Sequence, residues 1–281
     1  MTTDVLVSTD WAMQHLQDPD KRFIEVDVDT TQYESGHLPG AIAFNWQSQL
    51  QDQVTRDIIS KEGFEKLASE AGITPQTTVV LYGDNNNWFA AYAFWLFKYY
   101  GHEDVRLIDG GRKKLLAENR PLVTTVPTYP KTDYKVSKIN ADLRADRDYI
   151  RQRLDKVNAS FALIDVRSPA EFVGDIIAPP GMTETAQRPG HIPGAKNVPW
   201  GTAVAEDGTF KPVEELRKIY GAKGISDDKD VVAYCRIGER SSHTWFALKY
   251  LLGLKNVRNY DGSWTEWGNL IGAPIAKGAE S

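Results

Sequence analysis

The sequence of 281 residues contains one cysteine, Cys235. A single cysteine excludes an intramolecular disulfide, so the chain is not one of the small secreted proteins that disulfides stabilise. A free thiol is typical of a reducing compartment, and we expect the protein to be cytoplasmic.

The chain also lacks any apolar run long enough to span a bilayer, and its first residues, MTTDVLVSTDWAMQHL, have no basic or apolar region typical of a secretory signal. It has no basic run, and its formal net charge is −5. We therefore expect no membrane partner and no nucleic-acid partner. Apolar residues make up 41% of the sequence, which is enough for substantial cores, and the length suits two domains.

An internal repeat organises the chain. GHLPGA at Gly36–Ala41 returns as GHIPGA at Gly190–Ala195, 154 residues later. VVLY at Val79–Tyr82 returns as VVAY at Val231–Tyr234, 152 residues later. RFIEV likewise resembles FALIDV, and DVRLIDGG resembles NVRNYDGS, in the same order along the chain. Four collinear matches at about half the chain length indicate two copies of one domain.

Each copy alternates short, uninterrupted apolar runs with helical patterning. Such runs are typical of buried strands in a parallel sheet, so we predict an α/β fold of two tandem domains. Each domain is a doubly wound, mostly parallel sheet flanked by helices, with functional residues just past the carboxyl ends of strands. The predicted strands are Phe23–Val26, Thr78–Tyr82, Ala162–Val166 and Asp230–Tyr234, and the predicted helices include Phe64–Ala71 and Val213–Tyr220.

The domain boundaries follow from composition. Pro121–Lys138 is rich in Pro, Thr and Lys, which is typical of an extended connection. We predict a first domain at 1–125, a linker at 126–140 and a second domain at 141–281. The second copy alone carries an insertion that includes Ile176–Arg188, which marks it as functionally different.

Cys235 directly follows the predicted strand Asp230–Tyr234 and begins the string CRIGERSS. We predict a six-residue loop and then a helix from about Ser242 to Leu252, with Ser241 or Ser242 as its N-cap. Glycine at 238 allows a tight curl whose backbone N–H groups point at the sulfur, as does the positive end of the helix. This predicted cradle comprises Ile237, Gly238, Glu239 and Ser241.

Two arginines in the same string, Arg236 and Arg240, add fixed positive charge. Both should favour the thiolate, which is the attacking form of cysteine. The alternative is an inert buried thiol, because most cysteines at strand ends only fill space. The first copy has Gly83 and Asp84 at the matching place, with neither a thiol nor an arginine, and is predicted to be inactive.

The motifs LIDVRSPAEF, GHIPGA, CRIGERSS and YDGSWTEW together resemble the tandem-domain members of the rhodanese family over essentially the whole chain. The resemblance implies a thiosulfate sulfurtransferase with an inactive first domain and an active second one. Cys235 would take the sulfane sulfur of thiosulfate as a persulfide and pass it to cyanide or a thiol. The resemblance implies no metal or redox cofactor.

The resemblance also implies roles for residues around the cysteine. Arg188, with Arg236 and Arg240, is expected to hold the anionic end of the donor. Asp165 and Arg167 are expected to brace a strand end, and His191 and His243 to make local contacts. Whether Trp88, Phe89 and Trp200 line the pocket is left open.

Three other functions are considered. A 3-mercaptopyruvate sulfurtransferase is the alternative within the family. A cysteine phosphatase or arsenate reductase needs an arginine six residues after the cysteine, whereas Arg240 is the fifth and Ser241 the sixth. A protein that only docks partners would not need the intact Cys235 loop.

Overall fold

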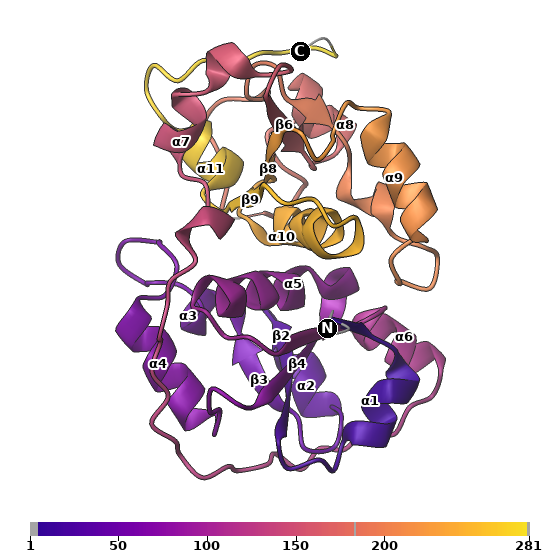
Figure 1. The fold of residues 1–281 in the computed structure, drawn as a ribbon. Coiled ribbons are helices and arrows are strands. Elements are labelled where there is room, and N and C mark those ends of the chain that lie inside the picture. Colours follow the sequence, from indigo (N-terminus) through magenta and orange to yellow (C-terminus); the bar gives the residue numbers. More distant parts are fainter. Residues whose placement is uncertain (1–4, 183, 280–281) are drawn as a thin grey trace. The chain divides into compact units, whose positions relative to one another are not determined.

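The computed structural model describes residues 5–182 and 184–279; Thr183, within the predicted insertion, lies outside the described residues. The chain divides into two compact units. The first extends to Ala141 and includes Ala205–Thr209, and the second comprises Asp142–Val204 and the chain from Phe210 onward. Figure 1 shows the helices of each unit packed around its sheet.

The first unit contains a sheet in which every pair of neighbouring strands is parallel, in the order β1-β5-β4-β2-β3. The helix after β4 packs against β2, β4 and β5. In chain order the elements are β1 Leu6–Val7, α1 Thr9–His15, β2 Lys21–Asp27, α2 Thr31–Ser35, β3 Ile42–Asn45, α3 Trp46–Gln49, α4 Lys61–Glu70, β4 Thr78–Tyr82, α5 Asp84–Tyr99, β5 Val105–Ile108 and α6 Gly111–Ala117.

The second unit contains a parallel sheet in the order β7-β6-β8-β9, and the helix after β8 packs against β8 and β9. Its helices and strands are α7 Arg147–Arg151, β6 Phe161–Asp165, α8 Pro169–Val173, β7 Lys196–Asn197, α9 Val213–Gly221, β8 Asp230–Tyr234, α10 Glu239–Phe246, β9 Val257–Tyr260 and α11 Ser263–Trp267. Short 3₁₀ turns lie at Ala141–Leu143, Leu154–Lys156 and Trp200–Ala203, and a π-helical turn, Ala247–Leu251, extends α10.

The two sheets share one topology, because β3-β2-β4-β5 corresponds to β7-β6-β8-β9. The central strands are buried along their length, with every residue of β4 and β6 buried. Strands covered by helices on both faces need such continuous apolar runs. The predicted α/β fold of two tandem, mostly parallel domains is confirmed.

The segment predicted as a linker, 126–140, has no helix or strand but packs on the first unit. The Tyr129 hydroxyl donates to the Gly40 carbonyl at 2.7 Å, and the Arg22 guanidinium lies 3.2 Å from the centre of the Tyr129 ring. Tyr134 is buried and its hydroxyl lies 3.0 Å from Nδ1 of His102. Two tyrosines thus attach an extended segment to the first unit. Within the described ranges, no helix has the length and apolar character needed to cross a bilayer.

Candidate active site at Cys235

Cys235 lies at the carboxyl end of β8 and is fully buried. Its backbone is held from both sides by the turn that begins α11. The Cys235 N–H donates to Oγ of Ser263 at 3.0 Å, and the Cys235 carbonyl accepts the N–H of Trp264 at 3.0 Å. The backbone of Cys235 is therefore fixed by the residues that follow the neighbouring strand, β9.

The loop after Cys235 is shorter than expected, since α10 begins at Glu239 and its N-cap is Gly238. Gly238 takes a φ of 99°, and a Cβ there would lie 2.9 Å from Cα of Asp261. Only glycine fits this turn. The predicted serine N-cap is wrong, because the Ser241 and Ser242 hydroxyls donate back to the Gly238 carbonyl at 3.1 and 2.7 Å. The turn brings the Gly238 N–H within 3.1 Å of the Cys235 sulfur.

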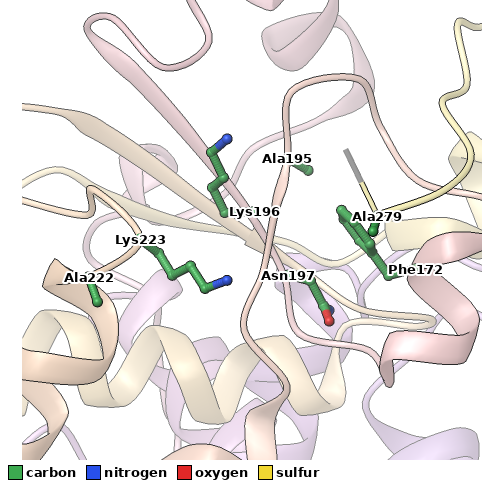
Figure 2. A pocket seen from close by; sticks show the side chains of 7 residues that line it. All are labelled: Phe172, Ala195, Lys196, Asn197, Ala222, Lys223 and Ala279. Atoms are coloured by element: carbon green, nitrogen blue, oxygen red, sulfur yellow. The ribbon is translucent and has the colours of Figure 1, made fainter. Parts of the chain in front are cut away.

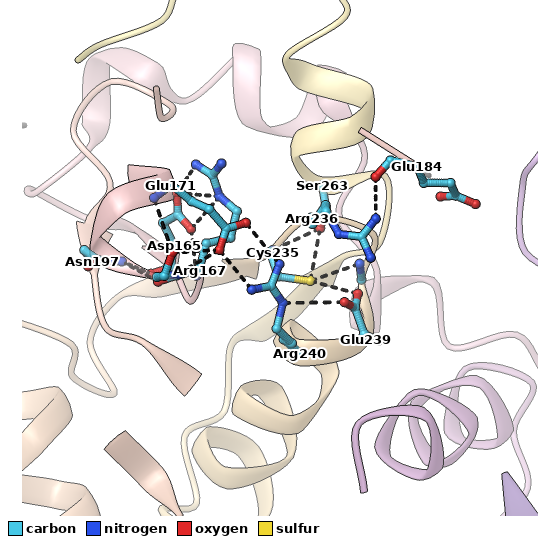
Figure 3. A network of polar contacts seen from close by, with 12 residues as sticks. Asp165, Arg167, Glu171, Glu184, Asn197, Cys235, Arg236, Glu239, Arg240 and Ser263 are labelled. Carbon is cyan, nitrogen blue, oxygen red and sulfur yellow. Dashed lines mark hydrogen bonds and ion pairs between the residues drawn. The ribbon is translucent and has the colours of Figure 1, made fainter. Parts of the chain in front are cut away.

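The carboxylate of Glu239 also touches the sulfur. Cys235 Sγ lies 3.2 Å from Oε2 of Glu239 and donates to it, as Figure 3 shows. Burial raises the pKa of the Cys235 thiol, and the Glu239 charge raises it further, against the opposite influence of Arg240 and Ser241. Arg240 thus acts in favour of the thiolate, but burial and the Glu239 charge outweigh it in the resting structure.

The guanidinium of Arg240 forms ion pairs with two carboxylates. Its Nη1 and Nη2 lie 3.1 and 3.3 Å from the two carboxylate oxygens of Glu171, and its Nε lies 3.5 Å from Oε1 of Glu239. Burial alone would lower the pKa of Arg240, but Glu239 and Glu171 raise it, so the guanidinium stays charged. Glu171 sits in α8, where it also completes a capping box with Ser168. Sequence reasoning did not identify Glu171 as a site residue, although LIDVRSPAEF contains it.

Arg236 is buried beside the loop and its Nη1 donates to the carbonyl of Glu184, in the insertion. Its Nε is buried and has no hydrogen-bond partner among the described residues. The Arg236 carbonyl accepts the N–H of Thr265 at 3.0 Å, which fixes the start of the side chain. Arg236 thus keeps an unused donor next to the cysteine.

Arg188, which is expected to hold the anionic end of the donor, lies with its guanidinium among backbone carbonyls. Its guanidinium donates to four backbone carbonyls at and just beyond the end of α11: Trp267, Gly268, Leu270 and Ala273. Its own carbonyl accepts the indole N–H of Trp264 at 3.0 Å. The guanidinium therefore holds the chain after α11, and each of its nitrogens is used in that task.

The remaining polar residues fit local bracing. Arg167 pairs with Asp165 at 2.6 Å and donates to the Gly190 carbonyl at 2.7 Å, so the pair connects the end of β6 to the GHIPGA turn. His191 stacks on Phe172 with ring centres 3.7 Å apart and its Nδ1 lies 2.8 Å from the Phe172 carbonyl. Both observations match the expected structural roles.

His243 is fully enclosed, and burial lowers its pKa to about 3. It stacks on Phe210 at 4.3 Å and meets the edge of Trp200 at 5.9 Å. A neutral, enclosed imidazole of this kind serves packing. In the first unit Phe89 packs against Trp46, with ring centres 5.2 Å apart.

A hollow of about 570 Å³ opens elsewhere on the second unit (Figure 2). Two lysines stand at it, and no residue of the Cys235 loop lines it. The lining residues are Phe172, Ala195, Lys196, Asn197, Ala222, Lys223 and Ala279. Within 5–182 and 184–279, no three His, Cys, Asp or Glu side chains gather in a way that could hold a metal ion.

Known proteins resemble the chain over its whole length. The model of the Rhodanese-like domain matches twice, at residues 8–118 and 146–270. A protein of Haloferax volcanii named "Putative thiosulfate sulfurtransferase" is 56% identical over 280 residues, 98% of this chain and 97% of that protein. The "Sulfur carrier protein TtuD" of Thermus thermophilus is 58% identical over 279 residues, 99% of this chain and 98% of that protein.

Among solved structures, one of EanB with a cysteine persulfide and ergothioneine superimposes with a TM-score of 0.84. It is 26% identical in sequence, and the match covers 98% of this chain and 70% of that chain. The thiosulfate, sulfur carrier and persulfide in these names refer to those proteins and not to this chain.

Proposed function

The chain belongs to the rhodanese family of sulfurtransferases, and we propose that it moves sulfane sulfur from thiosulfate to a thiophilic acceptor through a persulfide on Cys235. The observation that carries this proposal is the contact of the Gly238 N–H with the Cys235 sulfur, at the positive end of α10. Such donors stabilise a negatively charged sulfur. The EanB structure, by its name, holds a cysteine persulfide of the same kind.

The cycle has two sulfur transfers. The Cys235 sulfur attacks the sulfane sulfur of thiosulfate, a new S–S bond forms, the S–S bond of thiosulfate breaks and sulfite leaves with the electron pair. Cyanide or a thiol then attacks the outer sulfur of the persulfide, which frees Cys235 again. The chain has one cysteine, so no second thiol can replace it in either step.

The test is the mass of the protein after incubation with thiosulfate. Wild type should gain one sulfur, about 32 Da, and release one sulfite per chain, because the covalent intermediate accumulates without an acceptor. Cys235→Ser should gain no sulfur, since a hydroxyl forms no persulfide. Sulfur gain in the serine variant, or none in wild type, would overturn the proposal.

The donor preference rests on Arg236. Its unpartnered Nε is a charged donor for the sulfonate end of thiosulfate. Arg236→Ala should lose about 1.5–3 kcal/mol of this interaction, on the order of 10- to 150-fold in kcat/KM for thiosulfate. Arg217→Ala, at an exposed position of α9, is the matched control. Arg188→Ala should instead lower the melting temperature, because four carbonyls lose their donor.

Two alternatives are measured in the same assay. A rate with 3-mercaptopyruvate far above that with thiosulfate would make the chain a mercaptopyruvate sulfurtransferase. A sulfur carrier role is suggested by the 58% identity with TtuD. Transfer of labelled sulfur from the persulfide to a protein acceptor, faster than to cyanide, would assign that role.

A further inference from the structure

The charged atom that contacts the Cys235 sulfur is a carboxylate oxygen. Oε2 of Glu239 lies 3.2 Å from Sγ, and both side chains are buried, Glu239 with 2% of its surface exposed. A carboxylate is an acceptor, so the hydrogen of this contact comes from the thiol. The resting site therefore holds a neutral thiol that already donates to a base.

We propose that Glu239 is the catalytic proton acceptor of Cys235, removing the thiol proton as the sulfur attacks the donor. This inference rests on the function proposed above. In the first step the S–H bond breaks, its proton moves to Oε2, and the sulfur uses the freed electron pair to form the new S–S bond. The S–S bond of thiosulfate breaks, and the departing sulfite takes the proton from Glu239 and leaves as bisulfite. Atoms and charge balance without a further reactant.

The neighbours of Glu239 hold its carboxylate in the position that this role requires. Nε of Arg240 lies 3.5 Å from Oε1, which leaves Oε2 turned to the sulfur. Arg240 is itself fixed by its two contacts with Glu171 on α8. Arg240 and Glu171 are thus positioning residues.

The charges around the sulfur explain why a base is useful there. Arg236 lies in the loop and Arg240 in α10, and Glu171 on α8 faces Arg240. Asp261, after β9, is paired with Arg144 at 2.7 Å. A thiolate beside the Glu239 carboxylate would place two negative charges 3.2 Å apart in a buried site, which is costly. Moving the proton to Glu239 as the sulfur gains its bond avoids that state.

The competing view is that the Glu239 charge only raises the pKa of the Cys235 thiol and takes no proton from it. The two views predict opposite changes in the reaction rate for Glu239→Gln. The amide removes the negative charge, so under either view the pH midpoint of Cys235 alkylation by iodoacetamide falls. If Glu239 only opposes the thiolate, thiosulfate should then react faster at pH 7. If Glu239 is the base, the reaction should be slower, although the thiol ionises more readily.

The experiment measures single-turnover sulfite release from thiosulfate between pH 5 and 9, in H₂O and D₂O. We expect Glu239→Gln to react about 100-fold more slowly at pH 7, the range of general base catalysis, and to approach wild type as the pH rises. Wild type should show a solvent isotope effect that the variant loses. Glu239→Asp should recover part of the rate, and Glu214→Gln, at an exposed position of α9, should match wild type.

The outcomes separate the two proposals. A rate for Glu239→Gln equal to or above that of wild type at pH 7 overturns the role of Glu239, while the added sulfur on Cys235 still supports the persulfide. If wild type releases no sulfite and gains no sulfur, the proposed function fails instead. If Glu239→Gln does not fold, the rate and isotope effect of Glu239→Asp decide, since unchanged values there overturn the role.

Discussion

The loops after β4 and β8 make matching backbone hydrogen bonds but carry different side chains. The Gly83 carbonyl accepts the N–H of Arg112 at 3.0 Å, just as the Cys235 carbonyl accepts that of Trp264. The Gly83 N–H donates to Oδ1 of Asn87 at 2.9 Å, where the Cys235 N–H uses Ser263. The anchoring of a strand end has therefore been kept in a unit that lacks the thiol.

The acceptors of these two N–H groups, Asn87 and Ser263, do not occupy matching positions in the two units. Gly111 and Ser263 hold matching positions with φ of 53° and 52°. A Cβ on Gly111 would lie 2.2 Å from Oδ1 of Asn87, so the asparagine fills the space that the serine side chain occupies in the second unit. Asn87 itself takes a left-handed φ of 65°. The N–H at the strand end is therefore bonded in both units, but the acceptor comes from α5 in the first unit and from α11 in the second.

The charges at the two strand ends differ more. Asp27 occupies the place of Arg167, and the arginine that pairs with the strand carboxylate comes from α6, with Arg112 2.8 Å from Glu25. The N–H of Asp84 donates to Asp27 at 2.7 Å. The first unit thus gathers carboxylates where the second pairs each acid with an arginine, and we expect it neither to stabilise a thiolate nor to bind a dianion.

The largest effect is expected from moving the thiol between units. Gly83→Cys combined with Cys235→Ser should show no sulfur transfer. Its Cβ would lie 2.4 Å from the Val26 carbonyl oxygen and 2.9 Å from Oδ1 of Asp27. Thiosulfate-dependent sulfite release is the measurement, with Cys235→Ser alone as the baseline. Turnover above that baseline would mean that the loop charges do not decide reactivity.

Asp27→Asn should change the stability of the first unit by the next largest amount. Burial raises the pKa of Asp27 to about 8, so the folded protein holds this proton more tightly than the unfolded chain does. The unfolding free energy therefore declines as the pH rises from about 4 to about 8, by about 1.4 kcal/mol for each pKa unit and so on the order of several kcal/mol at most.

Asparagine keeps the acceptor for Asp84 and removes this decline. Urea unfolding at pH 5 and pH 8.5 should show the variant gaining stability over wild type mainly at the higher pH. Asp133→Asn, whose side chain is 86% exposed, is the control and should show no such gain. A gain of the same size at both pH values would contradict the raised pKa.

One buried ion pair from each unit, Arg240–Glu171 and Arg112–Glu25, allows a matched test of smaller size. Arg240→Lys and Arg112→Lys each replace a forked guanidinium with a point charge, which should cost about 1.5–3 kcal/mol of stability. Only Arg240→Lys should also lower kcat/KM for thiosulfate, by about tenfold, because it alone positions Glu239. Melting temperatures and rates separate the two effects. Equal loss of activity in both variants would mean that the first unit contributes directly to the reaction.

Ser263→Gly should have the smallest effect. It makes position 263 like Gly111 and removes the acceptor of the Cys235 N–H, a loss of about 1 kcal/mol and hence about fivefold in rate. The left-handed backbone is kept, because glycine takes it more readily than serine. Asn87→Ala removes the matching acceptor in the first unit and should leave the rate unchanged.

The sequence predicted the fold and the place of the thiol because both depend on local patterns. The bounds of β4 and β8 agree with the predicted strands residue for residue, since uninterrupted apolar runs leave little choice in a sheet covered on both faces. Cys235 follows β8 as expected. The predicted start of α10 was wrong because the left-handed turn at Gly238 was not counted as its N-cap.

The side-chain partners could not be predicted in the same way. Arg240 meets Glu171 from a segment 69 residues away, and no spacing rule connects the two. Arg188 lies close to GHIPGA in sequence, but its guanidinium reaches carbonyls about 80 residues further along the chain. Glu239 lies within CRIGERSS and was predicted to contribute its backbone, but no sequence rule shows that its carboxylate contacts the sulfur.

The full burial of Cys235 has a consequence for oxidative damage. Peroxide attacks the exposed thiolate, and a neutral thiol with no exposed surface reacts slowly. With no second cysteine in the chain, a sulfenic acid at this position has no internal thiol to reduce it and could proceed to irreversible forms. We therefore expect the burial of Cys235 to slow the oxidation of its thiol.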